Sequence, residues 1–164
     1  MCIRILKSLV DMKKEYTFDE LLHKAASYCS ISEHCISDVE EKLKAWGVNP
    51  ADSEKIIQHL IKQDFINEKR YSRAFVRDKF GMNKWGKIKI SLAMREKGID
   101  KEMIADALKV IDDGEYEEQL ARLLKNKLHT INYEFEYEKQ GKLFRFAQSR
   151  GFENNVIERV LRRI

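Results

Sequence analysis

The residues best suited to chemistry in this sequence are three arginines near the middle of the chain. Arg70, Arg73 and Arg77 recur at i, i+3 and i+7, which places them on one face of a helix predicted over about residues 68–80. The planar guanidinium of arginine binds phosphate or carboxylate through two parallel hydrogen bonds. Three like charges in one row repel each other, so we expect this arginine row to be unfavourable unless an anion lies against it. We therefore predict that the row binds an anionic partner.

Three lysines follow the arginine row, in a loop and at the start of the next predicted helix. Lys84, Lys87 and Lys89 surround the pair Trp85-Gly86. Positive charges at a helix start oppose the helix dipole, so helix stability does not account for them. We predict that they extend the anion-binding surface, the alternative being that they are ordinary solvated charges. Trp85 itself is better explained as a core residue.

A second basic group, Arg159, Arg162 and Arg163, lies at the C-terminal end of the sequence. Cations are favourable in the last turn of a helix, which explains this group without a ligand. The group can nevertheless extend a binding surface, and we keep it as a possible secondary patch.

The net charge is distributed unevenly along the chain. Residues 65–101 carry a net charge of +7, whereas residues 1–64 carry −2 and residues 102–164 carry −1. The whole excess of +4 therefore lies in the middle third, where basic and aromatic residues interleave. This pattern is typical of a surface that meets an anionic polymer.

Catalysis, metal binding and cofactor binding have little support in the sequence. The four histidines are scattered, and none has cysteine or carboxylate partners at the spacing of metal ligands. No glycine-rich phosphate loop or G-x-S-x-G motif is present. The three cysteines suggest reduced thiols in a cytoplasmic protein. No apolar run approaches the roughly 20 residues of a membrane span. We predict a cytoplasmic protein that is not an enzyme, needs no metal or cofactor and does not enter a membrane.

Helix signals punctuate most of the chain. Capping boxes are predicted at Thr17 with Glu20 and at Ser37 with Glu40, and Asn49-Pro50 has the form of a helix start. Seven glycines and one proline are too few for a turn-rich β-sandwich. The alternation in residues 87–90 suits a strand as well as a helix, and we favour the helix because Leu92 and Met94 extend its apolar face. The sequence thus predicts an all-α protein.

An internal repeat of about 50 residues organises these helices. Gly47, Gly98 and Gly151 each end one helix, and another helix begins just after each of them. Apolar residues recur at the same distances from these glycines. They are Val39, Ile90 and Leu143 eight residues before, Leu43, Met94 and Ala147 four before, and Leu60, Ile111 and Ile164 thirteen after. Helix caps are predicted at Asp100 and at Asn154 or Asn155. We predict an N-terminal extension over 1–17 and three-helix repeats over 18–64, 65–113 and 114–164.

The central repeat also has a predicted division between its buried and basic faces. Tyr71, Ala74, Phe75 and Asp78 fall within one arc of the helix and are expected to face the core. The arginine row lies on the adjacent arc and is expected to stay on the surface.

These motifs resemble those of the RecX family, the bacterial regulators of the RecA recombinase. The block over residues 65–77 resembles the family motif L-D/N-D/E-x-R-F/Y-A-R-x-F-V-R, and residues 85–99 resemble its G-x-x-x-I-x-x-x-L-x-x-K-G-I continuation. Residues 37–43 resemble the first-repeat motif S-x-x-E-L-x-x-K-L, and residues 142–152 resemble the third-repeat motif. The chain departs from the family at Lys87, where many members have proline, and at Trp46, where a basic residue is usual.

The resemblance implies three tandem three-helix bundles in an elongated, curved molecule without catalytic activity. It also implies binding to the RecA–single-stranded-DNA filament, with weak binding to single-stranded DNA that is not sequence-specific, and inhibition of RecA through limited filament extension or promoted disassembly. We expect a monomer. The alternative from a different class is a sequence-specific DNA-binding regulator, because three-helix units can present a recognition helix to the major groove. A pure scaffold is a third possibility.

Overall fold

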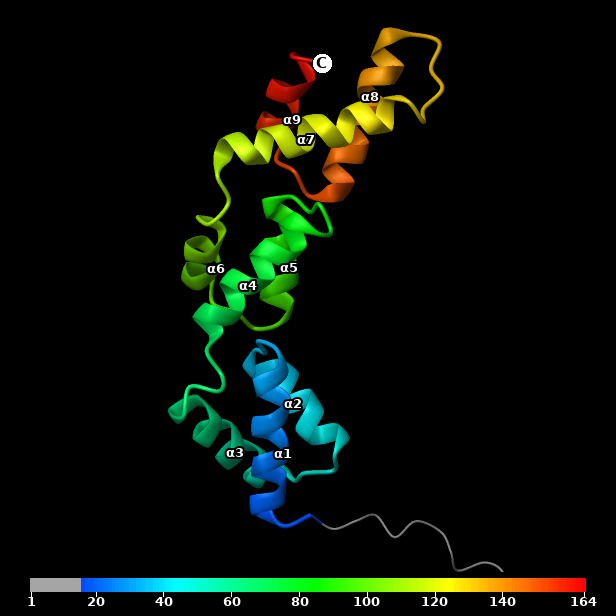
Figure 1. The fold of residues 1–164 in the computed structure, drawn as a ribbon. Coiled ribbons are helices and arrows are strands. Elements are labelled where there is room, and N and C mark those ends of the chain that lie inside the picture. Colours follow the sequence, from blue (N-terminus) through cyan, green and yellow to red (C-terminus); the bar gives the residue numbers. More distant parts are fainter. Residues whose placement is uncertain (1–15) are drawn as a thin grey trace, which may run out of the picture.

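The computed structural model describes residues 16–164 and is all-helical over that range, as predicted. The predicted extension over 1–17 therefore lies almost wholly outside the described residues. The helices follow one another in an elongated, gently curved stack from α1 at one end to α9 at the other (Figure 1). Their bounds are α1 Phe18–Ile31, α2 Ile36–Ala45, α3 Pro50–Lys62, α4 Glu68–Gly81, α5 Lys87–Glu96, α6 Lys101–Leu108, α7 Asp113–Leu128, α8 Glu136–Arg150 and α9 Asn154–Leu161.

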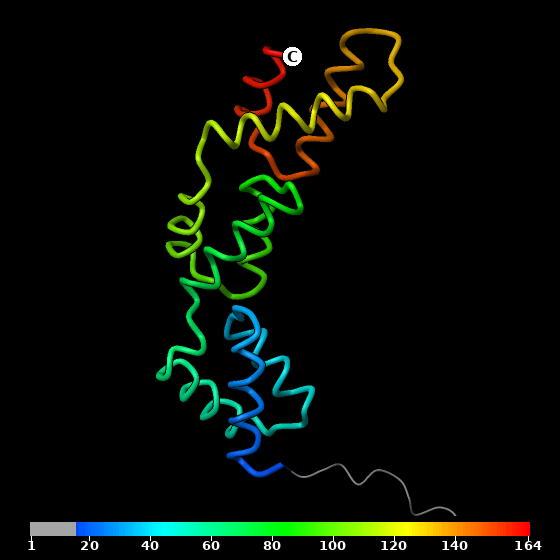
Figure 2. The backbone as a smooth tube through the Cα atoms, viewed as in Figure 1, coloured from blue at the N-terminus to red at the C-terminus, as the bar shows by residue number. Residues whose placement is uncertain are grey.

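Consecutive helices pack in groups of three, which we call the first trio (α1–α3), the middle trio (α4–α6) and the third trio (α7–α9). The backbone trace shows the three groups one above another (Figure 2). The linkers between trios are residues 63–67 and 109–112. Of the predicted repeats 18–64, 65–113 and 114–164, the first boundary falls within the linker 63–67 and the second falls after the first residue of α7. The repeat boundaries remain a prediction.

The second helix of each trio ends at a glycine, as predicted from the repeat. Gly47, Gly98 and Gly151 have φ angles of 79°, 80° and 87°, a left-handed conformation that glycine adopts at little cost. The residues eight and four before each glycine are all buried. The position thirteen residues after each glycine is buried at Leu60 and Ile111, but the prediction is wrong at Ile164, which is 37% exposed.

Three of the predicted helix starts are confirmed. Thr17 and Glu20 form a capping box, in which the Glu20 carboxylate accepts from the Thr17 N–H at 2.9 Å. Asn49 caps α3, and Asp100 caps α6. Residues 87–90 form the first turn of α5, so the helix that we favoured there is also confirmed. Leu92, however, is 52% exposed and does not extend the buried face.

Two other predicted caps are wrong. Helix α2 begins two residues earlier than expected, with Cys35 as N-cap and the Asp38 carboxylate accepting from the Cys35 N–H at 3.4 Å. The Ser37 hydroxyl instead donates to the Lys97 carbonyl at 2.9 Å, across to the middle trio. The cap of α9 is Glu153, so Asn154 and Asn155 are already helical.

The buried face of α4 is rotated from the predicted one. Tyr71 is buried as expected, but Asp78 is exposed and Ala74 and Phe75 are only partly covered. The positions that enter the core are, besides Tyr71, Ser72, Val76 and Phe80. The arginine row remains on the exposed side, so the error concerns the core and not the surface.

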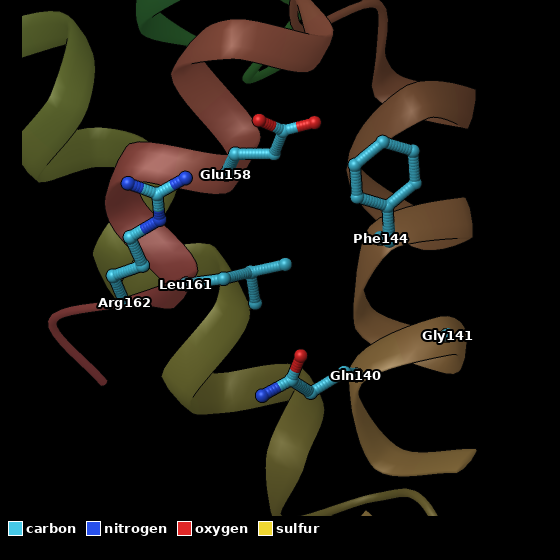
Figure 3. Close-up of a pocket in the computed structure, with 6 residues that line it drawn as sticks. All are labelled: Gln140, Gly141, Phe144, Glu158, Leu161 and Arg162. Atoms are coloured by element: carbon cyan, nitrogen blue, oxygen red, sulfur yellow. The ribbon is translucent and has the colours of Figure 1, made fainter. Parts of the chain in front are cut away.

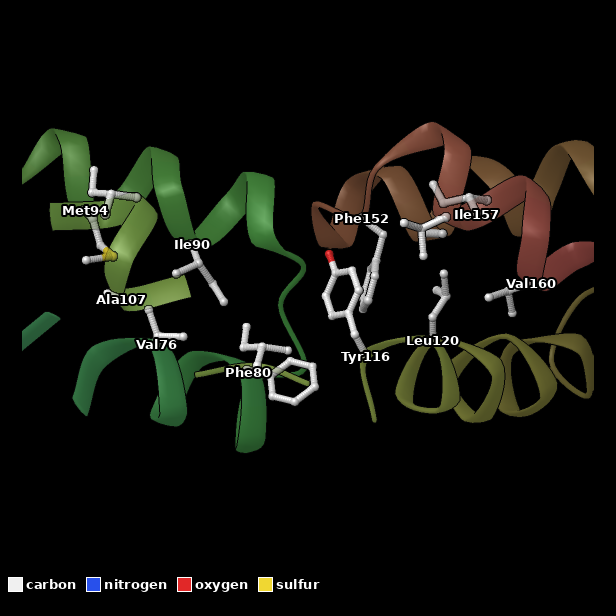
Figure 4. Close-up of a cluster of buried hydrophobic side chains, with 14 of the residues drawn as sticks. Val76, Phe80, Ile90, Met94, Ala107, Tyr116, Leu120, Phe152, Ile157 and Val160 are labelled. Atoms are coloured by element: carbon white, nitrogen blue, oxygen red, sulfur yellow. The ribbon is translucent and has the colours of Figure 1, made fainter. Parts of the chain in front are cut away.

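The middle and third trios share one hydrophobic core, whereas the first trio has its own. Where the two trios meet, Tyr116 lies between Phe80 and Phe152, with ring centroids 5.9 and 5.0 Å away (Figure 4). Shared burial of this kind resists relative movement, because separating the trios would expose these rings to water. The middle and third trios therefore act as one body.

The joint between these two trios is a direct contact of backbone with backbone. The Gly86 N–H donates to the Arg150 carbonyl at 2.8 Å, and the Ile88 N–H donates to the Gly151 carbonyl at 3.0 Å. A β-carbon on Gly86 would overlap the Gly151 carbonyl, and one on Gly151 would overlap Lys89. Both glycines are thus needed for their lack of a side chain.

A buried tyrosine completes this joint. The Tyr116 hydroxyl accepts from the Lys87 N–H at 2.8 Å and donates to the Glu153 carboxylate at 2.5 Å. Burial raises the pKa of Tyr116 well above its ordinary value, so the hydroxyl stays protonated and remains a donor. The buried hydroxyl thus has a hydrogen-bond partner both as donor and as acceptor, as buried polar groups generally do.

The joint between the first and middle trios uses residues at corresponding positions. Tyr71 and Tyr116 are each the fourth residue of the first helix of their trio, and Cys35 and Gly86 each cap the second helix of the preceding trio. Cys35 belongs to the same buried cluster as Tyr71. An ion pair closes this joint, with the Lys97 ammonium 2.5 Å from the Asp38 carboxylate.

Replacement of Gly86 by alanine tests the backbone contact. We expect Gly86→Ala to lower the free energy of unfolding by about 1–3 kcal/mol, because the added β-carbon overlaps fixed backbone. The matched control is Gly81→Ala at the end of α4, where a β-carbon meets nothing within 4 Å. It should leave stability unchanged or raise it by up to about 1 kcal/mol. Urea denaturation measures both, and equal stability of Gly86→Ala and wild type would contradict a close joint.

Removal of the Asp38 charge tests the other joint. Burial raises the pKa of Asp38, but the hydrogen bonds from Lys97 and Cys35 and the charge of Lys97 together outweigh it, so the net pKa is lowered. The stability from this pair is therefore present above the unfolded pKa and is lost as pH falls through the folded pKa. We expect Asp38→Asn to be less stable than wild type at pH 7, with a difference that shrinks below about pH 4.

The control for Asp38→Asn is Glu40→Gln, which neutralises an exposed carboxylate of the same helix. Urea midpoints at pH 7 and near pH 3 should be close to those of wild type for this control. A constant loss at both pH values in Asp38→Asn would show that shape, and not charge, explains the effect.

Candidate nucleic-acid interface

The arginine row lies along one hollow of the surface of α4. Arg70, Arg73 and Arg77 line it together with Lys69, and the rest of its wall comes from Glu33, Asn67 and Ala74. Three of these cations project from successive turns of the exposed face: Lys69, Arg73 and Arg77, at i, i+4 and i+8. We call these three residues the α4 stripe. The structure therefore brings the predicted arginines together and adds a lysine.

Arg70 is held by carboxylates of the chain itself. Its Nε lies 2.5 Å from the Glu33 carboxylate, and its other two nitrogens bind the side chain and backbone of Asp64 at 2.9 and 3.0 Å. The Glu33 carboxylate raises the pKa of Arg70, and hydrogen bonds from Asn67 and Arg70 lower the pKa of Asp64. Arg70 thus contributes to the attachment of the middle trio to the first trio.

Arg73 forms an exposed ion pair, and Arg77 forms no ion pair with any of the described residues. The Arg73 guanidinium lies 3.2 Å from the Asp106 carboxylate of α6, and both side chains are more than a third exposed. Burial raises the pKa of Asp106, but Arg73 and Lys109 together have the larger effect and lower the net pKa, so the carboxylate is charged. Arg70 and Arg73 therefore already have carboxylate partners within the chain, and two of these partners, Glu33 and Asp106, are distant in sequence.

The three predicted lysines do not join the α4 stripe in the same hollow. Lys84 has a left-handed backbone with φ of 58°, and its ammonium donates to the Gly81 carbonyl. Lys87 pairs with Asp113 at 2.8 Å and lies over the Tyr116 ring, so it belongs to the joint with the third trio. These positions lie at the end of the middle trio opposite to Arg70.

Lys89 and Trp85 form a contact of their own. The Lys89 ammonium lies 4.8 Å from the centre of the Trp85 ring, and the Lys79 ammonium lies 5.3 Å from it. Trp85 is partly buried and packs against the shared core, in keeping with its interpretation as a core residue. The two ammonium groups are stabilised by the ring face.

The secondary basic patch is largely occupied within the third trio. Arg159 and Arg163 both bind the Glu117 carboxylate of α7, at 2.9 and 2.6 Å. The hydrogen bond from Arg159 lowers the pKa of Glu117, which keeps it ionised. Arg162 instead lines a hollow between α8 and α9 with Phe144 and Glu158 (Figure 3). Ion pairs within the third trio therefore account for Arg159 and Arg163, but not for Arg162.

Lys69 is the member of the α4 stripe that the sequence interpretation missed. It is exposed and precedes Arg73 by four residues, the spacing that places it on the same helix face. Helical spacing alone could have found it, because Lys69, Arg73 and Arg77 form a straighter row than Arg70, Arg73 and Arg77.

Among residues 16–164, no group of three histidine, cysteine or carboxylate side chains is arranged to hold a metal ion. Cys29 and Cys35 are free and buried. None of the helices in this part of the chain is long and apolar enough to cross a membrane.

Comparison with known proteins assigns the chain to a family. Residues 67–108 match the model of the second three-helix domain of RecX, and residues 115–161 match that of the third. Together these segments make up more than half of the chain.

Curated relatives and a solved structure agree with this assignment. The chain is 26% identical over 95% of its length to the regulatory protein RecX of Lactobacillus johnsonii, and 30% identical over 77% of its length to that of Clostridium beijerinckii. It spans 58% and 60% of the length of these two relatives. The crystal structure of RecX from Lactobacillus salivarius superposes with a TM-score of 0.79 at 25% identity, over 89% of this chain and 95% of that chain. The chain belongs to the RecX family.

Proposed function

We propose that this protein binds the RecA–single-stranded-DNA filament and restrains RecA by limiting filament extension or promoting disassembly. The observation that carries the proposal is the α4 stripe, three exposed cations on one helix face in the most basic part of the chain. Membership of a family whose curated members are named regulatory proteins supports a regulatory role.

The α4 stripe has the dimensions and exposure of a phosphate-binding surface. Successive members are about 6 Å apart along the helix axis, so the stripe covers about 12 Å. Arg77 has no ion pair among the described residues, and the Arg73–Asp106 pair is exposed to solvent and correspondingly weak. A phosphate backbone can take the place of Asp106, which supports binding that is weak, salt-dependent and insensitive to base sequence. Arg70 would stay in its joint.

The stacked trios also support binding along a filament. The joint between the middle and third trios is a close backbone contact, and the joint between the first and middle trios is closed by the Asp38–Lys97 ion pair. A chain held in this elongated form can reach across neighbouring subunits of a filament, with its basic middle placed on the DNA and its two ends on protein. We further propose that it acts as a monomer in the cytoplasm.

Reversal of charge on the α4 stripe tests the proposed site. We expect Arg73→Glu combined with Arg77→Glu to weaken binding to a single-stranded oligonucleotide by about tenfold or more at low salt. Inhibition of the RecA filament should fall in parallel, while the thermal unfolding midpoint should change little, because both side chains are exposed.

The matched control reverses two exposed lysines of α3 instead, Lys55→Glu with Lys62→Glu. It makes the same change in net charge outside the stripe and should retain DNA binding and inhibition. Full inhibition by a folded Arg73→Glu, Arg77→Glu protein would rule out the α4 stripe as the site.

A further inference from the structure

An aromatic loop projects from the third trio. Residues 129–138, which we call the α7–α8 spur, join α7 to the first turn of α8 and extend beyond the packed helices (Figure 1). Three of its side chains, Tyr133, Phe135 and Tyr137, are 44%, 55% and 72% exposed. Large apolar side chains clustered on a surface mark an interaction site more often than scattered ones do.

The spur is held in one conformation by its own contacts. The Phe135 and Tyr137 rings are stacked, with centroids 5.7 Å apart and an interplanar angle of 12°. The Lys142 ammonium donates to the Asn132 carbonyl at 2.5 Å, and the Glu138 carboxylate accepts from the Glu134 N–H at 3.1 Å. A surface that is ordered before binding loses little conformational entropy when a partner docks.

The charge of the spur identifies the class of partner. Glutamates alternate with the aromatic residues at positions 134, 136 and 138, and residues 129–138 contain no lysine or arginine. Glu136 pairs with the neighbouring Lys139 at 2.5 Å, which leaves Glu134 and Glu138 without an ion pair among the described residues. Exposed aromatic rings can stack on the bases of single-stranded nucleic acid, but such platforms lie in positively charged grooves. Carboxylates beside the rings repel a phosphate backbone, whereas they complement lysines and arginines on a protein surface.

We propose that the α7–α8 spur is a protein-docking element that accepts an apolar patch rimmed by basic side chains. Phe135 and Tyr137 supply the apolar anchor, and Glu134, whose carboxylate has no ion pair within the described residues, meets a cation of the partner. This assignment rests on the proposed function, in which that partner surface belongs to RecA. The α4 stripe lies in a different trio, so DNA and protein would be contacted by separate parts of the chain.

The test replaces the two stacked rings by serine. Phe135 caps α8, and serine is a preferred residue at that position, so Phe135→Ser with Tyr137→Ser should fold normally. We expect binding to DNA-free RecA from the same organism to weaken by about tenfold or more, because exposed aromatic anchors commonly dominate an interface. Binding to an oligo-dT strand should change by less than about twofold.

The control is Ile31→Ser with Met82→Ser, which removes two apolar side chains that are 85% and 81% exposed in the other trios. It should retain both activities. Wild-type binding of RecA by the spur variant would overturn the spur assignment alone. Loss of oligo-dT binding equal to the loss of RecA binding would also overturn it, in favour of a base-stacking platform. Failure of the wild-type protein to bind RecA at all would overturn the proposed function and this partner with it.

Discussion

The contact of Gly86 with Gly151 fixes how the basic middle of this protein is oriented relative to the third trio. Two helix ends from consecutive trios meet there without intervening side chains, and Tyr116 fills the space beside them. Backbone groups hydrogen-bonded at 2.8 and 3.0 Å leave little freedom for rotation, so the middle and third trios keep one orientation. The equivalent joint to the first trio uses Cys35 and Tyr71 in the corresponding positions and adds the Asp38–Lys97 pair.

This construction explains why basic residues with similar sequence signals have different roles. Lys87 and Arg70 are drawn into the joints on either side of the middle trio by Asp113, Glu33 and Asp64. The stripe formed by Lys69, Arg73 and Arg77 lies between the joints and stays exposed. The charges that hold the trios together are thus separate from the charges that remain for a ligand.

The periodic features of the sequence predicted most of the fold. Capping residues and left-handed glycines depend on neighbours within a few positions, and the tandem trios followed from Gly47, Gly98 and Gly151. The errors arose where a residue is used at long range. Ser37 binds Lys97 instead of capping its own helix, and the carboxylates beside Arg70 and Arg73 are 37 and 33 residues away. Such partners carry no local signal, so the division of the basic residues between joints and surface required the structure.

The central claim is that the protein restrains RecA at the level of the assembled filament, and not by sequestering every free subunit or by coating the DNA. The most direct measurement is the ATPase activity of RecA on single-stranded DNA while this protein is added at substoichiometric ratios. The account predicts a progressive fall well below one protein per RecA subunit, because too little protein is then present to sequester every subunit or to coat the DNA. No effect up to a stoichiometric excess, with RecA from the same organism, would contradict it.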